Sequence, residues 1–143
     1  MQAEQISIFL ENKAGRLSEV TGILSANGVN IRALSLADTT DFGVLRLIVD
    51  ANAKAEDTLK AVAFTVRKNK VVAVEVQDQP GGLHRILQAL FSAGINVEYM
   101  YAFVRQSGDN AVMIFRFDQP DQAVSVLSDK GFVIVGGDKL YKL

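Results

Sequence analysis

The sequence predicts an α+β fold of two βαββαβ units in tandem, each an antiparallel sheet with helices on one face. Two observations predict it. The chain repeats itself after 66 to 68 residues, and within each copy the hydrophobic residues alternate between the spacing of a strand and that of a helix. Because such a period suits a small domain used twice, we expect one unit over residues 1–69 and a second over residues 70–143.

The repeat is visible without gaps over the first half of each copy. Gly15 matches Gly81, and the following positions keep their type: Leu17 with Leu83, Val20 with Ile86, Leu24 with Leu90, Gly28 with Gly94 and Asn30 with Asn96. Further along, Val44–Asp50 matches Val112–Asp118, two residues later than the first offset. The extra residues fall in a turn predicted at Gln106–Asn110, since loops tolerate insertions.

Each copy reads strand, helix, strand, strand, helix, strand. Alternating Ile6, Ile8 and Leu10 predict a first strand, and the spacing of Leu17, Val20, Thr21 and Leu24 predicts a helix with one buried face. The remaining elements are second strands from Ile31 and Val97, turns at Asp38–Asp41 and Gln106–Asn110, third strands at Val44–Asp50 and Val112–Asp118, second helices from near Ala53 and Pro120, and fourth strands at Phe64–Arg67 and Phe132–Val135. With right-handed crossovers this order gives a ferredoxin-like arrangement.

Composition excludes several classes of function. The chain has 143 residues, a net charge of −1 and no cysteine, so thiolate metal sites, disulfides and cysteine nucleophiles are excluded. It lacks the basic excess of a nucleic-acid binder, and no apolar stretch is long enough to span a bilayer. With no secretory signal at Met1–Gln5 either, we expect a soluble cytoplasmic protein that binds no nucleic acid, membrane, metal or cofactor.

The motifs of common enzyme classes are absent from the sequence. The sequence has no nucleophile elbow, zinc-binding H-E-x-x-H helix or phosphate-binding loop, and the single histidine, His84, has only Asp78 as a potential acid–base partner. RNA-binding domains are an alternative, because they share the predicted strand order. The third strand of the first copy, Val44–Ile48, lacks the aromatic residues such a domain uses. We therefore expect no catalytic residue and no RNA-binding face.

The turns after the first strands carry the most chemical information. They read Asn12-Lys13-Ala14-Gly15-Arg16-Leu17 and Asp78-Gln79-Pro80-Gly81-Gly82-Leu83. A helix that begins after a glycine turn offers unpaired N–H groups to a carboxylate, and Asn12 or Asp78 can accept a hydrogen bond from an ammonium group. One turn could thus hold both charged groups of an amino acid. The same residues are also good turn formers, so a purely structural role stays open.

These residues resemble the ACT domain family of small-molecule-binding regulatory modules. The family's pattern is a D/N-x-P-G-x-L turn followed, after a helix, by a Gly-(Val/Ile)-Asn-Ile-like step. The second copy has Asp78–Leu83 with Gly94-Ile95-Asn96-Val97, and the first has Asn12–Leu17 with Gly28-Val29-Asn30-Ile31. The first copy departs from the pattern, with Ala14 in place of proline. Leu10 and Val76 stand where some serine-sensing relatives have histidine.

The resemblance implies an amino-acid site where two domains meet, the turn of one facing the asparagine segment of its neighbour. It pairs Asn12–Leu17 with the Asn96 region and Asp78–Leu83 with the Asn30 region, within one chain or between two. The expected ligand contacts are Asn12, Ala14, Gly15, Arg16, Leu17, Asn30, Ile31, Asp78, Pro80, Gly81, Gly82, Leu83, Asn96 and Val97.

The expected partners are a small amino acid, a second copy of the chain in a homodimer, and a separate enzyme or regulator. We expect the module to be non-catalytic and to regulate amino-acid metabolism. A module that has lost its ligand and only mediates assembly is the alternative.

Overall fold

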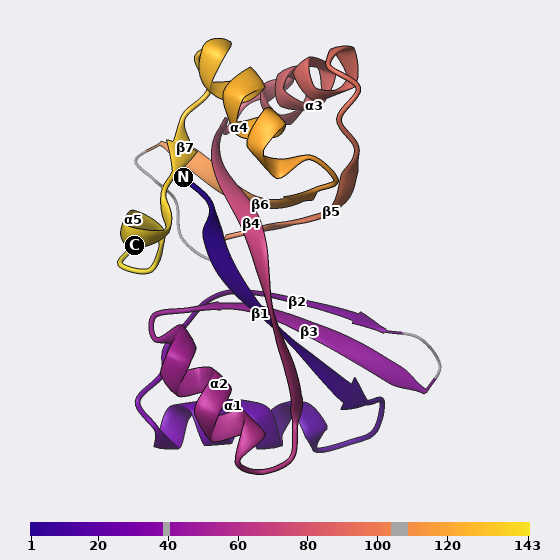
Figure 1. The fold of residues 1–143 in the computed structure, drawn as a ribbon, viewed down its shortest axis with the longest axis vertical. Coiled ribbons are helices and arrows are strands. Elements are labelled where there is room, and N and C mark those ends of the chain that lie inside the picture. Colours follow the sequence, from indigo (N-terminus) through magenta and orange to yellow (C-terminus); the bar gives the residue numbers. More distant parts are fainter. Residues whose placement is uncertain (39–40, 104–108) are drawn as a thin grey trace. The chain divides into compact units, whose positions relative to one another are not determined.

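The computed structural model describes residues 1–38, 41–103 and 109–143. It divides into two compact units, an N-terminal unit of Glu4–Asn69 and a C-terminal unit of Lys70–Leu143 with Met1–Ala3 (Figure 1). The turns predicted at 38–41 and 106–110 lie in large part outside the described residues.

The N-terminal unit has the predicted βαββαβ order. Its elements are β1 (Ala3–Glu11), α1 (Arg16–Ala26), β2 (Ile31–Asp38), β3 (Phe42–Val49), α2 (Asn52–Lys60) and the first part of β4 (Thr65–Gln77). The strands lie in the order β2-β3-β1-β4, and β3 pairs antiparallel with both β1 and β2. Ile6 lies opposite Leu47 and Ile8 opposite Leu45, which places these four side chains on one face of the sheet.

The C-terminal unit repeats this arrangement with the second part of β4 as its first strand. The other elements are α3 (Gly82–Ser92), β5 (Val97–Ala102), β6 (Asn110–Phe117), α4 (Pro120–Asp129), β7 (Ile134–Val135) and α5 (Gly137–Leu140). The order is β5-β6-β4, with β7 on the other side of β4, and all three pairings are antiparallel. The predicted fold class, two ferredoxin-like units in tandem, is confirmed.

Three details differ from the sequence prediction. The fourth strand of the first copy and the first strand of the second form one continuous strand, β4, because no glycine or proline interrupts Thr65–Gln77. The last strand, β7, covers only Ile134–Val135 of the predicted Phe132–Val135. A short helix, α5, follows it and was not predicted.

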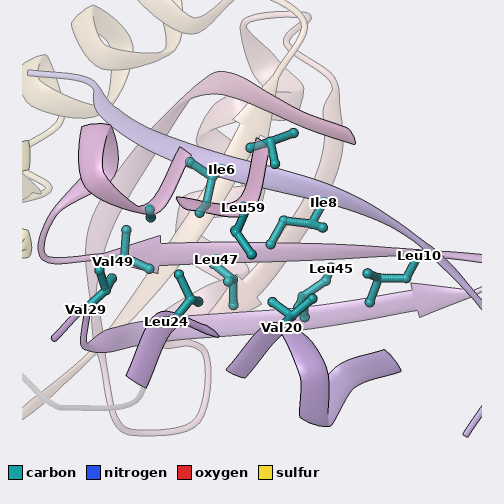
Figure 2. Close-up of a cluster of buried hydrophobic side chains, with 12 residues drawn as sticks. Ile6, Ile8, Leu10, Val20, Leu24, Val29, Leu45, Leu47, Val49 and Leu59 are labelled. Atoms are coloured by element: carbon teal, nitrogen blue, oxygen red, sulfur yellow. The ribbon is translucent and has the colours of Figure 1, made fainter. Parts of the chain in front are cut away.

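Each unit has its own hydrophobic core between the sheet and its helices. Figure 2 shows the N-terminal core, in which Ile6, Ile8 and Leu10 of β1 pack with Val20 and Leu24 of α1 and with side chains of β3. The C-terminal core repeats these positions, with Val72, Val74 and Val76 of β4, Ile86 and Leu90 of α3, and the stacked rings of Phe115 and Phe117. Most periodic positions of the sequence are therefore core positions, as predicted. Leu17 and Thr21 are the exceptions: both were predicted on the buried face of α1 and both are exposed, Leu17 in the first turn and Thr21 with its hydroxyl donating to the carbonyls of Leu17 and Ser18.

Gly82, the first residue of α3, is held against the preceding strand. A Cβ atom added to Gly82 would lie 2.0 Å from the carbonyl oxygen of Gln77, so no larger residue fits without moving backbone. Gly22 in the middle of α1 is the opposite case, because a Cβ there would meet nothing within 4 Å. The close approach at Gly82 therefore requires a residue without a side chain where the chain passes from β4 into α3.

We predict that Gly82→Ala destabilises the protein by about 2–3 kcal/mol, because the added methyl group overlaps a fixed backbone oxygen. Gly22→Ala should raise stability by up to about 1 kcal/mol, since alanine favours the helix more than glycine does. Thermal melting of the two variants beside the parent protein measures both effects. Equal melting temperatures for Gly82→Ala and the parent would contradict the tight contact.

Candidate functional site

The two strand-to-helix turns have the same backbone conformation. The residue before each helix is a glycine in the left-handed region, Gly15 with φ 90° and Gly81 with φ 86°, where side-chain-bearing residues are disfavoured. Each turn is closed by a backbone bond, from Arg16 N–H to the Lys13 carbonyl at 3.4 Å and from Gly82 N–H to the Gln79 carbonyl at 3.0 Å. The chain therefore presents the start of α1 and the start of α3 in equivalent ways.

Both helices begin without a side-chain cap. Neither Gly15 nor Gly81 can supply one, and no other side chain caps α1 or α3 within the described residues. The N–H groups of Leu17 and Leu83 lie in the first turn, where a helix has no internal acceptor for them. With the positive end of the helix dipole, these groups can accept a carboxylate.

The residue at the entrance to each turn is exposed, and the two differ in their contacts. Asn12 N–H donates to the Asp41 carbonyl at 2.9 Å, which ties the first turn to β3. The Asp78 carboxylate is exposed and has no hydrogen bond or ion pair in the described part of the chain. Asp78 can therefore receive a cationic group without giving up a partner.

The two asparagines are held by their backbones, not by their side chains. Asn30 N–H donates to the Asp50 carboxylate at 2.9 Å, and the Asp50 N–H returns a bond to the Asn30 carbonyl at 3.1 Å. Asn96 and Asp118 make the same reciprocal pair at 3.0 and 3.2 Å. Among the described residues neither asparagine carboxamide has a hydrogen-bond partner, and both residues are exposed.

Asp50 and Asp118 were not singled out in the sequence analysis, although they occupy matching positions at the ends of the two third strands. Each fixes the start of the second strand beside it. This pairing leaves the asparagine side chain free to contact another molecule.

Within one unit the turn and the asparagine lie at opposite ends of the first helix (Figure 1). Helix α1 and helix α3 each have 11 residues, and a helix of that length spans about 16 Å. A small amino acid cannot reach across that distance. The structure thus brings the residues of each turn together but does not bring a turn to its own asparagine.

The first turn carries an ion-pair cluster that the second lacks. Arg16 binds Glu11 at 2.8 Å and Glu19 at 2.9 Å, and Lys13 lies 3.4 Å from Glu11. The hydrogen bond from Arg16, assisted by Lys13, lowers the pKa of the Glu11 carboxyl below its ordinary value. The second turn has Gly82 in place of Arg16 and Gln77 in place of Glu11, so its charge comes from Asp78 and Arg85 instead.

Some of the predicted site residues border hollows in the surface. Asn30 and Ile31 line a hollow of about 340 Å³ with Thr21 and Ser25 of α1. Arg16 lines another in the N-terminal unit, and Gly82 lines one in the C-terminal unit. His84 is exposed on the first turn of α3.

Metal sites and membrane-spanning helices are both absent from residues 1–38, 41–103 and 109–143. No group of three or more histidine, aspartate or glutamate side chains there is placed to hold a metal ion. No helix in the same ranges is long and apolar enough to cross a membrane.

Comparison with known proteins identifies relatives of the whole fold. A crystal structure of protein BT0572 from Bacteroides thetaiotaomicron matches with a TM-score of 0.94 and 40% identity, covering 100% of this chain and 98% of that one. The ligand-free regulatory subunit of aspartate kinase from Thermus thermophilus matches with a TM-score of 0.65 and 17% identity, covering 90% and 92%. At that identity the second match shows a shared fold.

A shorter match concerns a curated sequence. The acetolactate synthase small subunit of Buchnera aphidicola subsp. Baizongia pistaciae (strain Bp) is 37% identical over 49 residues, which are 34% of this chain and 31% of that protein. The matched part thus spans less than one third of that relative's length.

The family comparison covers the chain from end to end. Residues 1–143 match the family described as the ACT domain pair. The duplicated βαββαβ units and the two glycine turns are the features through which the sequence resembled ACT domains. The chain belongs to the ACT domain pair family, and it shares its fold with the regulatory subunit of aspartate kinase from Thermus thermophilus.

Proposed function

We propose that this ACT pair is a non-catalytic regulatory module that binds a small amino acid between two ACT units. The observation that carries the proposal is the repeated turn in which a left-handed glycine leads into an uncapped helix. In the second copy this helix start lies beside Asp78, whose carboxylate has no partner among the described residues. Such a turn complements a zwitterion, with an N–H donor for its carboxylate and an oxygen acceptor for its ammonium group.

The ligand is held in the proposal by groups from two units. The turn N–H groups of Leu17 or Leu83 bind the ligand's carboxylate, and Asn12 or Asp78 binds its ammonium group. The carboxamide of Asn96 or Asn30, from another unit, closes the site. The length of α1 and α3 supports this division, because it keeps each turn away from its own asparagine. The second unit comes from the same chain or from the partner chain of a homodimer.

Binding between units gives the module its regulatory action. A ligand that contacts two units favours the arrangement in which both contacts are made, and it shifts the population toward that arrangement. The regulated target is a separate enzyme. The similarities to a subunit of acetolactate synthase and to the regulatory subunit of aspartate kinase support a target in amino-acid metabolism.

A ligand-free assembly module is the second candidate. The first turn supports the ligand-free assembly module more than the second turn does. Ala14 replaces proline in the first turn, and Arg16 is already bound by Glu11 and Glu19. We therefore propose that the site at Asp78–Leu83 is the stronger of the two. Assembly alone would leave the free groups of that turn without a role.

The first prediction from this proposal concerns the identity of the ligand. In a thermal-shift screen with each of the twenty amino acids at millimolar concentration, one or a few should raise the melting temperature in a concentration-dependent way. A ligand present at a hundred times its dissociation constant stabilises the folded state by about 2.7 kcal/mol, which such a screen detects. A flat response to all twenty would favour the assembly module.

The second prediction concerns Asp78. Asp78→Ala should weaken binding of the amino acid found in the screen by about tenfold to a hundredfold, as loss of a charged hydrogen bond costs about 1.5–3 kcal/mol. Calorimetric titration measures the affinity. Asp57→Ala is the matched control, since Asp57 is also exposed and has no partner in the described part of the chain, but it lies on α2. Equal affinities for both variants would remove Asp78 from the site.

The third prediction concerns the pairing of turn and asparagine. Asn30→Ala should weaken the Asp78 site without lowering the melting temperature, because the Asn30 backbone and not its side chain binds Asp50. The double variant with Asp78→Ala should lose less affinity than the two single losses combined, since both contact one ligand. Asn96→Ala provides the comparison and should leave the Asp78 site unchanged. A stronger effect from Asn96→Ala would reverse the pairing.

A further inference from the structure

A pair of hollows occupies matching positions in the two units, away from the asparagines. Each lies where the end of the unit's first strand, the start of its first helix and the segment before its fourth strand come together. The N-terminal hollow has about 350 Å³ and the C-terminal hollow about 310 Å³. The lining residues correspond through the sequence repeat: Glu11 with Gln77, Arg16 with Gly82, Phe42 with Asn110, Val62 with Lys130 and Phe64 with Phe132.

The N-terminal hollow satisfies its own charge. Arg16 reaches into it and is bound on one side by Glu11 and on the other by Glu19, at 2.8 and 2.9 Å. The rest of the wall is largely apolar, with Phe9, Phe42 and Phe64. An incoming anion would find the guanidinium already neutralised by two carboxylates.

The C-terminal hollow has neutral or basic residues at the positions where the N-terminal unit has its acids. Gln77 replaces Glu11, and Arg85 stands at the position of Glu19, so the guanidinium donates to the neutral Gln77 side chain instead of to carboxylates. Lys130 adds a second cation in place of Val62. Neither Arg85 nor Lys130 forms an ion pair with any described residue.

The same hollow contains one acidic residue and has open space. Glu75 receives a hydrogen bond from the Asn110 carboxamide at 3.3 Å, and the formal charge of the lining side chains is one positive overall. Gly82 cannot carry a side chain, because a Cβ there would overlap Gln77. The second copy therefore has no side chain at the position from which Arg16 projects in the first.

We propose that the C-terminal hollow is a second ligand site, which binds a small organic anion bearing a carboxylate or phosphate group. The guanidinium of Arg85 offers paired donors to such a planar or tetrahedral oxyanion, and the Lys130 ammonium adds a point charge. Ile86 and Phe132 provide an apolar floor for the carbon part of the ligand. The volume is at the lower end of small-molecule sites. Asp78, Asn30 and Asn96 do not line it, and Gly82 is the one residue that it shares with the proposed amino-acid site.

The binding test is a titration of the full-length protein with sodium succinate and, separately, with inorganic phosphate, at ionic strength held constant with sodium chloride. Amide resonances in nuclear magnetic resonance spectra report the site. We expect saturable shifts at Gly82, Arg85, Gly131 and Val133. Saturation with succinate alone identifies a carboxylate ligand, and saturation with phosphate alone identifies a phosphate ligand. Shifts that grow linearly with both anions, or no shifts, would overturn the proposal.

The test variant gives the second copy the residue type that the first copy has at the matching position. Gln77→Glu recreates the acid of Glu11 beside Arg85, so it should lower the affinity for the anion at least tenfold while the melting temperature is maintained. Gln122→Glu adds the same charge on exposed α4, outside the hollow, and should change the affinity less than twofold. Equal weakening by both variants would show diffuse attraction to net charge and overturn the site. Asp78→Ala should leave anion binding intact, which separates this result from a failure of the amino-acid site.

Discussion

The length of the first helix in each unit determines which groups of that unit can contact the same small ligand. The first strand of each unit ends at a glycine turn, and a helix of 11 residues then leads the chain back to the other end of the sheet. The groups suited to a carboxylate and an ammonium lie at one end, and the asparagine carboxamide lies at the other. A single βαββαβ unit therefore holds two half-sites that cannot combine with each other. The two units of one chain together have four such half-sites.

In the two asparagine segments the backbone makes the structural hydrogen bonds, and the side chains do not take part in them. Asp50 and Asp118 bind the backbone N–H groups of Asn30 and Asn96, and this reciprocal bonding fixes the start of the second strand. If the carboxamides made those bonds, the segment would be just as well anchored but would have nothing to offer a ligand. A fixed backbone with a free side chain is the arrangement that favours binding, because little order has to be imposed when the ligand arrives.

The repeat predicted most of the fold, and the reasons for its failures are physical. Hydrophobic spacing identified Ile6, Ile8 and Leu10 and their counterparts as core, because burial of one face imposes a period on the sequence. It could not show that β4 is continuous, since the end of one strand and the start of the next have the same spacing when no turn residue separates them. The Asn30–Asp50 bond joins residues far apart in sequence, and only their recurrence as Asn96–Asp118 could have indicated it.

The two copies have diverged at the positions where the site chemistry lies. The core residues kept their type, because a change of volume in a packed interior destabilises the fold. The charges around the first helix are not constrained in this way, and the second copy has Gln77, Gly82 and Arg85 where the first has Glu11, Arg16 and Glu19.

The difference with the largest consequence is Gly82 in place of Arg16. The second copy lacks the self-neutralising cluster of the first and has a glycine held against Gln77, and the hollow beside this glycine is lined by Arg85 and Lys130, which form no ion pair among the described residues. The first copy thus has its charges paired with one another, whereas Arg85 and Lys130 of the second have no ion-pair partner among the described residues, and in our proposal a bound anion supplies that partner.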